Sequence, residues 1–135
     1  MPLKHLNVPD AAPAPPTAKY SHAVQAGPLL YITGQLPADP DNLEAPLPDR
    51  IEAQTRLVFK NLQRIAEHAG YTLADTVFAR VYLTDFKRDY PGMNRVYQEY
   101  YPDDARLPGR TTVGVTALAR DALVEIDLVL WKDQE

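Results

Sequence analysis

The sequence has 135 residues, no cysteine and a formal net charge of −4, with 45% hydrophobic and 24% charged residues. This composition is ordinary for a single globular domain with one core, and the missing cysteines exclude disulfides, thiol catalysis and a cysteine-ligated metal. The acidic balance and the dispersed Lys and Arg residues argue against nucleic acid as the main partner, because binding to phosphates needs clustered basic residues.

The N-terminal segment, residues 1–17, contains four prolines between residues 8 and 17. Proline fixes φ and has no amide donor, so this proline-rich part is expected to be an extended arm rather than a strand or helix. It could be a plain linker or lie across a neighbouring surface. The segment has no apolar run typical of a signal peptide, and no stretch of the chain approaches the ~20 apolar residues of a membrane span. We therefore expect a cytoplasmic protein whose single domain covers residues 18–135.

Residues 22–35 predict a β-hairpin, because two β-rich runs flank the turn dipeptide Gly27-Pro28. Gly34, near the end of the second run, would let the backbone approach another group closely. The following segment, residues 37–48, holds four prolines and several acidic residues. It lacks the glycine and the terminal Glu spacing of a calcium loop, so we expect a solvated acidic loop and no metal site.

The best-defined element is a helix between Asp49 and Gly70. Asp49 with Glu52 resembles a capping box, and Gly70 is a typical stop signal. A strand over residues 76–83 follows, and then a second helix that begins at or near Pro91. Apolar residues recur at helical spacing in both helices: Ile51, Val58, Leu62, Ile65 and Ala69 in the first, and Met93, Val96, Tyr97 and Tyr100 in the second.

Two alternating runs close the chain, and they predict a single antiparallel hairpin. The first run, residues 110–115, begins with Arg110 and places Thr112 on the same face. In the second run Glu125 and Asp127 share a face opposite to the apolar side chains. One fixed cation and one acid would thus be carried on neighbouring strands, which makes this hairpin the best candidate for chemistry in a chain poor in reactive side chains.

The predicted order is therefore β-β-α-β-α-β-β, an α+β fold in which two helices cover one face of a mixed sheet. The second face would carry the apolar side chains of Tyr31, Phe78, Tyr82 and Val129. Because no helix is left to cover them, this face is expected to bind a partner subunit.

The sequence also contains a series of short motifs in a fixed order: Tyr20-Ser21-His22-Ala23-Val24, Thr33-Gly34-Gln35-Leu36-Pro37, Tyr82-Leu83-Thr84-Asp85, Asn94-Arg95-Val96-Tyr97, Pro108-Gly109-Arg110-Thr111-Thr112-Val113 and Val124-Glu125-Ile126. Together they resemble the signatures of the RidA family of reactive intermediate deaminases, also called the YjgF family. Many short motifs in the correct order are more specific than any one motif alone.

The resemblance implies a homotrimer of chorismate-mutase-like fold, with ligand sites in the clefts between subunits. Members of that family hydrolyse 2-imino acids, or their enamine tautomers, to 2-keto acids and ammonia. They use neither a metal nor an organic cofactor. The expected partner is thus a small imine or enamine that carries a carboxylate, such as 2-iminobutanoate or 2-iminopropanoate.

Residue by residue, the resemblance makes Arg110 the group that binds the substrate carboxylate, for which a planar guanidinium is well suited. Thr112 and Asn94 are further substrate-binding candidates. The resemblance makes Glu125 the residue that orients or activates water.

Tyr20 is a third catalytic candidate, because its hydroxyl could donate to that water or to the substrate nitrogen. Backbone groups of Thr33 and Gly34 could bind the polar end of the ligand, with Gly34 permitting a close approach. Tyr20, Thr33 and Asn94 could instead satisfy only local backbone groups.

Other functions stay open at this point. A trimeric module that binds small carboxylates or acts as a chaperone-like regulator, without catalysis, is the main alternative. Ribonuclease activity is the weakest reading, because the chain is acidic and has no paired histidines. Gly109 replaces the alanine usual before the arginine in the family, and the loop after Asp39 lacks the family's usual Lys-Thr-Gly turn. Both departures concern substrate preference more than the reaction.

Overall fold

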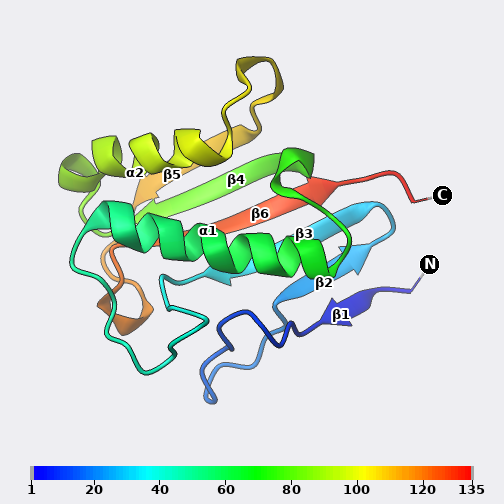
Figure 1. The fold of residues 1–135 in the computed structure, drawn as a ribbon, viewed down its shortest axis with the longest axis horizontal. Helices are drawn as coiled ribbons and strands as arrows, with labels where there is room; N and C mark the ends of the chain where they lie inside the picture. The colour runs from blue at the N-terminus through cyan, green and yellow to red at the C-terminus, as the bar shows by residue number, and fades with distance from the viewer. Residues whose placement is uncertain (1, 135) are drawn as a thin grey trace.

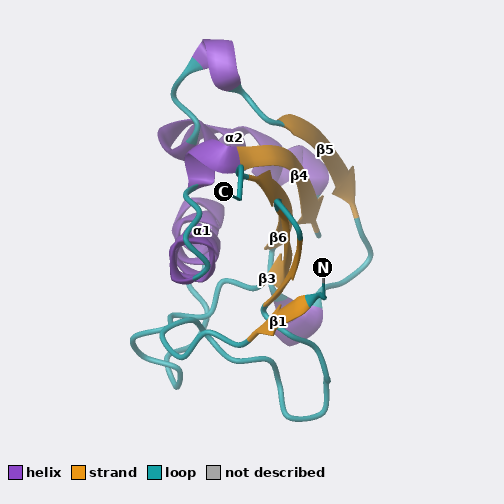
Figure 2. Cartoon of the chain, turned by 90° about the vertical axis from the view of Figure 1, so that its right-hand side faces the viewer, coloured by secondary structure: helices purple, strands orange, loops and turns teal. Residues whose placement is uncertain are grey.

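The structure is a computed structural model that describes residues 2–134. Its main elements are, in chain order, β1 Lys4–Leu6, β2 Ala23–Ala26, β3 Leu29–Gln35, α1 Ile51–His68, β4 Thr76–Leu83, α2 Phe86–Tyr100, β5 Gly109–Gly114 and β6 Val124–Trp131. The strands form one six-stranded mixed sheet in the order β1-β2-β3-β6-β4-β5, and both helices cover the same face (Figures 1 and 2). The predicted α+β fold is therefore confirmed. No helix within residues 2–134 has the length and apolar character that a bilayer span requires.

The last two strands do not form the predicted hairpin. β4 lies between them, parallel to β5 and antiparallel to β6. That prediction was wrong because alternation shows which side chains share a face but not which strand is the neighbour. α2 supplies the crossover connection that a parallel pair needs. β6 occupies the centre of the sheet, where Val124, Ile126, Leu128 and Leu130 are all buried beneath the helices.

The N-terminal segment contains a strand that the sequence did not reveal. β1 pairs antiparallel with β2 and adds a sixth strand at the sheet edge. Residues 8–17 form neither strand nor helix, as expected from their prolines. They nevertheless lie against their own domain, because Val8 and Ala11 are only 2% and 4% exposed. We call residues 8–16 the proline arm.

The helix starts differ from the prediction, whereas the stop of α1 agrees with it. Arg50 precedes α1 without any side-chain cap, and Arg95 of α2 donates to the Glu52 carboxylate at 2.6 Å. Gly70 does end α1, with a φ of +85° that favours glycine. α2 begins five residues before Pro91, because the side chain of Asp85 accepts a backbone N–H of the first turn and so caps the helix there.

The face of the sheet away from the helices exposes the apolar side chains that were expected there. Tyr31 is 47% exposed and Phe78 is 37% exposed. Tyr82 and Val129 are partly buried between these neighbours. We call this surface, together with Trp131 at the end of β6, the open sheet face. Exposed apolar side chains gathered on one face are typical of a surface that contacts another protein chain.

Candidate active site

The predicted site residues lie in two separate groups on opposite faces of the sheet. The arginine half-site consists of the predicted residues Asn94, Arg110 and Thr112, joined by Tyr97, which was not predicted. The glutamate half-site consists of Tyr20, Thr33, Gly34 and Glu125. Arg110 is in register with Ala79, which is fully buried beneath the helices. Glu125 stands between Val124 and Ile126, which are fully buried on that same side, so its own side chain points to the other face.

The guanidinium of Arg110 is held over the aromatic side chains of α2. Its central carbon lies 4.7 Å from the centroid of the Tyr97 ring and 5.8 Å from that of Tyr90, both within cation–π range. Its Nη2 donates to the Tyr90 hydroxyl at 3.3 Å. No acid among residues 2–134 forms an ion pair with Arg110. The guanidinium of Arg110 is therefore available to bind an anion from outside the chain.

Three polar atoms of the arginine half-site are buried without a hydrogen-bond partner: Asn94 Oδ1, the Tyr97 hydroxyl and Thr112 Oγ1. Buried polar groups without partners are rare in native proteins, so this cluster indicates a place where a polar ligand binds. Asn94, Tyr97 and Arg110 line a cavity of about 650 Å³. Burial raises the pKa of the Tyr97 hydroxyl, and the charge of Arg110 opposes that effect. The hydroxyl is thus a neutral donor near neutral pH.

The glutamate half-site is built around an irregularity in β3. The register between β3 and β6 shifts between Ile32 and Gln35, which places Gly34 at a β-bulge. The missing side chain at Gly34 leaves room for the carboxylate of Glu125, because a Cβ there would lie 2.9 Å from the Glu125 Cδ atom. β-Bulges are over-represented next to active sites, where they redirect a side chain.

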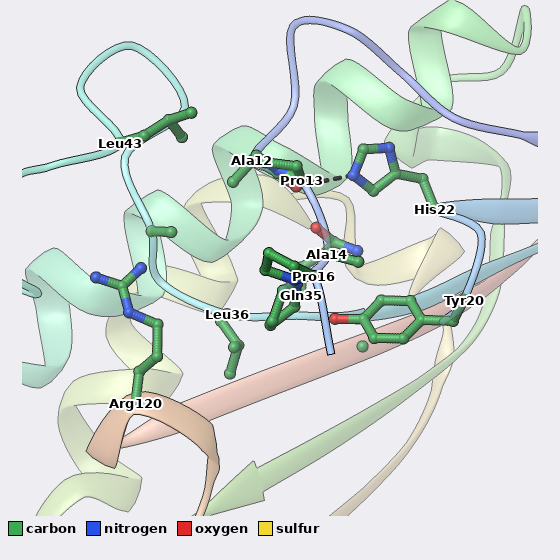
Figure 3. Close-up of a pocket in the computed structure, with 13 residues that line it drawn as sticks. Ala12, Pro13, Ala14, Pro16, Tyr20, His22, Gln35, Leu36, Leu43 and Arg120 are labelled. Atoms are coloured by element: carbon green, nitrogen blue, oxygen red, sulfur yellow. Dashed lines mark hydrogen bonds between the residues drawn. The ribbon is translucent and has the colours of Figure 1, made fainter. Parts of the chain in front are cut away.

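The electrostatics of this half-site couple Glu125 to Tyr20. Burial raises the pKa of the Glu125 carboxyl, and the nearby charge of Asp127 raises it further. Burial also raises the pKa of the Tyr20 hydroxyl, with an added contribution from Glu125. The two side chains therefore lie close enough to influence each other, and Tyr20 is a hydroxyl donor beside a carboxylate. A second cavity, of about 220 Å³, is lined by Tyr20 and Gly34 together with the proline arm (Figure 3).

Thr33 is occupied by contacts within the chain. Its hydroxyl donates to the Ser21 carbonyl at 2.7 Å, and its amide donates to the His22 carbonyl at 3.0 Å. Its carbonyl accepts from the Gln35 side chain at 2.9 Å. These contacts position the segment that carries Tyr20 and leave Thr33 with little free hydrogen-bonding capacity.

Sequence reasoning missed the aromatic support of Arg110. Tyr97 was assigned to the core stripe of α2, and it is indeed buried, but its ring also lies beneath the guanidinium. The signal was present in the spacing of Asn94 and Tyr97, which lie three residues apart and so face the same side of a helix. The contribution of Tyr90 had no comparable signal.

The chain matches the family described as Endoribonuclease L-PSP over residues 10–131. A RutC family protein of Pyrococcus horikoshii is 42% identical over 87% of this chain and 90% of its own length. The 3-aminoacrylate deaminase RutC of Acinetobacter baylyi is 38% identical over 91% of this chain and 94% of its own. A crystal structure of a Rid family protein of unknown function from Yersinia pestis has a TM-score of 0.86 and 30% identity, covering 97% of this chain and 100% of that one.

Proposed function

This chain belongs to the endoribonuclease L-PSP family, also known as YjgF or RidA, and on that premise we propose that it is a hydrolytic deaminase. Its substrates are 2-imino acids and their enamine tautomers, and its products are 2-keto acids and ammonia. The relative from Acinetobacter baylyi is a 3-aminoacrylate deaminase, which supports this reaction class. The observation that carries the proposal is the pair of incomplete half-sites, one with a cation that has no acidic partner among the described residues and one with a half-buried carboxylate.

In the arginine half-site, Arg110 binds the carboxylate of the substrate. A guanidinium forms two parallel hydrogen bonds to a carboxylate, which fixes the plane and orientation of the adjoining C=N group. The unpartnered atoms Asn94 Oδ1 and Thr112 Oγ1 supply further polar contacts, Asn94 from the wall of the cavity that Arg110 also lines and Thr112 from two residues along β5. The Thr112 hydroxyl can donate to a carboxylate oxygen, whereas the Asn94 oxygen accepts an N–H from the substrate.

In the glutamate half-site, Glu125 acts as a general base on a water molecule. The water oxygen bonds to the imine carbon while its proton passes to Glu125, and the nitrogen takes up a proton to become an amine. The resulting carbinolamine then collapses, so that the C–N bond breaks, ammonia leaves and the C=O of the keto acid forms. Tyr20 donates a hydrogen bond to the water or the nitrogen. An enamine first takes a proton on carbon to become the imine.

The two half-sites meet between copies of the chain. Within one chain the sheet separates Arg110 from Glu125, so a single copy cannot hold a small substrate between them. The open sheet face, with Tyr31 at 47% and Trp131 at 49% exposed, provides an apolar surface for the contact. A ring of three chains would repeat one interface and pair every arginine half-site with a glutamate half-site of the next copy. We therefore propose a homotrimer with three sites.

The alternative, a carboxylate-binding module without catalysis, needs only the arginine half-site. The half-buried Glu125, with its raised pKa and its place beside the bulge in β3, favours the enzyme, because perturbed acids cluster at catalytic sites.

A direct test generates 2-iminopropanoate or 2-iminobutanoate in situ with an amino acid oxidase. Keto acid release is then followed in competition with a trapping amine, with and without the protein. We expect a protein-dependent increase in the rate of hydrolysis and a mass of three chains by light scattering. A monomer, or an unchanged rate for these imines and for 3-aminoacrylate, would contradict the proposal.

A further inference from the structure

His22 fastens the proline arm to the domain through both of its ring nitrogens. The amide of Val8 donates to Nδ1 at 2.8 Å, and Nε2 lies 2.8 Å from the carbonyl oxygen of Ala12. Because Nδ1 accepts, the neutral ring carries its proton on Nε2 and donates it to that carbonyl. The side chain is only 5% exposed. A single histidine thus fixes two points of the arm four residues apart.

The arm has further anchors on α1. The Ala12 amide donates to Asn61 Oδ1 at 2.8 Å, so both backbone groups of Ala12 are held by side chains of the domain. Arg64 donates to the carbonyl of Asp10 at 2.9 Å. Residues 12–15 form neither turn nor regular element, and proline fixes φ there without needing hydrogen bonds. A turn follows, closed by the Ala18 amide donating to the Pro15 carbonyl at 2.9 Å. The direction of the arm past residue 12 therefore depends on the contacts at residues 8 and 12.

This stretch of the arm forms one wall of the cavity of about 220 Å³ beside Tyr20 and Gly34. Figure 3 shows Pro13, Ala14 and Pro16 facing the same space as Tyr20. The lining is mainly apolar and includes Leu36 and Leu43. For scale, an apolar cavity of ~150 Å³ holds a benzene molecule. The cavity thus has the size and chemistry for a hydrocarbon group.

We infer that this cavity is the compartment for an apolar side chain of the substrate and that His22 is the positioning residue that closes its wall. The inference rests on the proposed function, because it places the reacting C=N group at Glu125 and Tyr20. From that position, a substituent on the substrate extends past Gly34 to the side of the cavity that the proline arm forms. The ligand class is 2-imino or enamine acids that bear a branched or linear hydrocarbon group, in preference to the smallest members. Arg120 is the charged side chain in the lining, and it stands on the far side from Tyr20 (Figure 3).

Two substitutions at position 22 separate a positioning role from a merely structural one. Glutamine offers one acceptor and one donor and can keep both contacts to the arm. Alanine offers neither, so the arm loses its fixed course. We expect His22→Ala to lower kcat/KM for the leucine-derived imine by about tenfold, the smallest effect of losing a good apolar contact. The alanine-derived imine has no group in the cavity. The ratio of kcat/KM for the leucine-derived imine to kcat/KM for the alanine-derived imine therefore falls. His22→Gln should keep the ratio close to that of the native protein.

A second pair of variants tests the cavity without disturbing the histidine. Ala14→Trp puts a large side chain into the cavity, and Thr17→Trp puts the same side chain just after the arm, at an exposed position outside the lining. We expect the leucine-to-alanine ratio to fall in Ala14→Trp only. This pair decides the question even if His22→Ala does not fold. An unchanged ratio in Ala14→Trp overturns the inference, and so does an equal loss for both substrates in a folded His22→Ala.

Failure of the cavity assignment can be distinguished from failure of the proposed function. If the native protein hydrolyses neither imine, that function fails, and the cavity is then tested by calorimetric binding of the leucine-derived keto acid against pyruvate with the same four variants. If the leucine-derived keto acid binds more tightly than pyruvate and Ala14→Trp removes this difference, the cavity assignment is supported without any activity. Equal binding of the two acids would refute it.

Discussion

The carboxylate of Glu125 occupies the space in which a side chain at Gly34 would lie. A Cβ at that position would be 2.9 Å from the Glu125 Cδ atom and 3.2 Å from its Cγ atom. The bulge in β3 and the absence of a side chain at its centre thus determine where the proposed base is placed. The position of Gly34 is explained by this contact, because its backbone φ is not in the region that favours glycine.

We predict that Gly34→Ala lowers kcat strongly while the protein still folds. The added methyl group must push the carboxylate of Glu125 away from its place, and a displacement of ~1 Å in a catalytic group can reduce the rate by roughly a hundredfold. Steady-state kinetics with an in situ generated imine would measure the loss. The matched control is Gly114→Ala at the end of β5, where the new Cβ makes an ordinary contact of 3.4 Å with Phe86. Equal activity of the two variants would refute this role for Gly34.

We predict that Arg110→Lys and Arg110→Ala both lose most of kcat/KM. A lysine keeps the charge but not the two parallel hydrogen bonds, nor the planar stacking on Tyr97 at 4.7 Å. Loss of a charged hydrogen-bonding pair costs about 3 kcal/mol, which corresponds to roughly a hundredfold in rate.

The control for Arg110 is Arg106→Ala, which removes an exposed arginine from the neighbouring turn. We expect this variant to behave like the native protein. Binding of pyruvate, measured by calorimetry, should weaken in both Arg110 variants. If Arg110→Lys retained full activity, charge alone would be sufficient, and the proposed pair of parallel hydrogen bonds from the guanidinium would be wrong.

We predict that Asp127→Asn shifts the acidic limb of the pH–rate profile to lower pH. Glu125 acts as a base in its ionised form, so activity is present above its pKa and is lost as the pH falls through it. Burial and the charge of Asp127 raise that pKa, which places the limb above that of an ordinary glutamate. Removing the Asp127 charge lowers the pKa and moves the limb down. An unmoved limb in a folded Asp127→Asn variant would contradict the role of Glu125 as the base.

The parts of the fold that could be predicted depend on local signals. The turn at Gly27 and the stop at Gly70 both require a positive φ, and the structure has values of +60° and +85° there. The apolar stripe of α1 was correct because helical spacing determines which side chains face the core. The start of α2 was placed too late because proline is a strong signal for the first position of a helix, and Pro91 suggested that position. The actual cap, Asp85, is a single polar residue and a weaker signal.

The parts that could not be predicted depend on contacts between distant segments. The packing of whole elements determines which strands are neighbours in the sheet. The alternation of residues in β5 and β6 therefore did not indicate that β4 separates Arg110 from Glu125. The role of His22 depends on two backbone groups that lie 14 and 10 residues away along the chain. Backbone groups carry no sequence signal. The candidate site residues could therefore be identified from motifs, but their division into two half-sites could not.

The separation of the half-sites leads to a test with two inactive proteins. Arg110→Ala lacks the cation and Glu125→Gln lacks the base, so each is expected to be inactive alone. If every site combines Arg110 of one copy with Glu125 of another, mixed trimers contain some sites in which both residues are intact. Random mixing of equal amounts should restore about a quarter of the native activity, because each intact residue has a one-half chance of being present.

The mixture must first exchange subunits, so the two proteins are best mixed unfolded and refolded together. Each variant refolded alone provides the control, and light scattering confirms that the mixture contains the same assembly as the native protein. If both residues of a site came from one chain, every chain in the mixture would still lack one of them, and no activity would return. The structure predicts recovery, because the sheet lies between Arg110 and Glu125 within each copy.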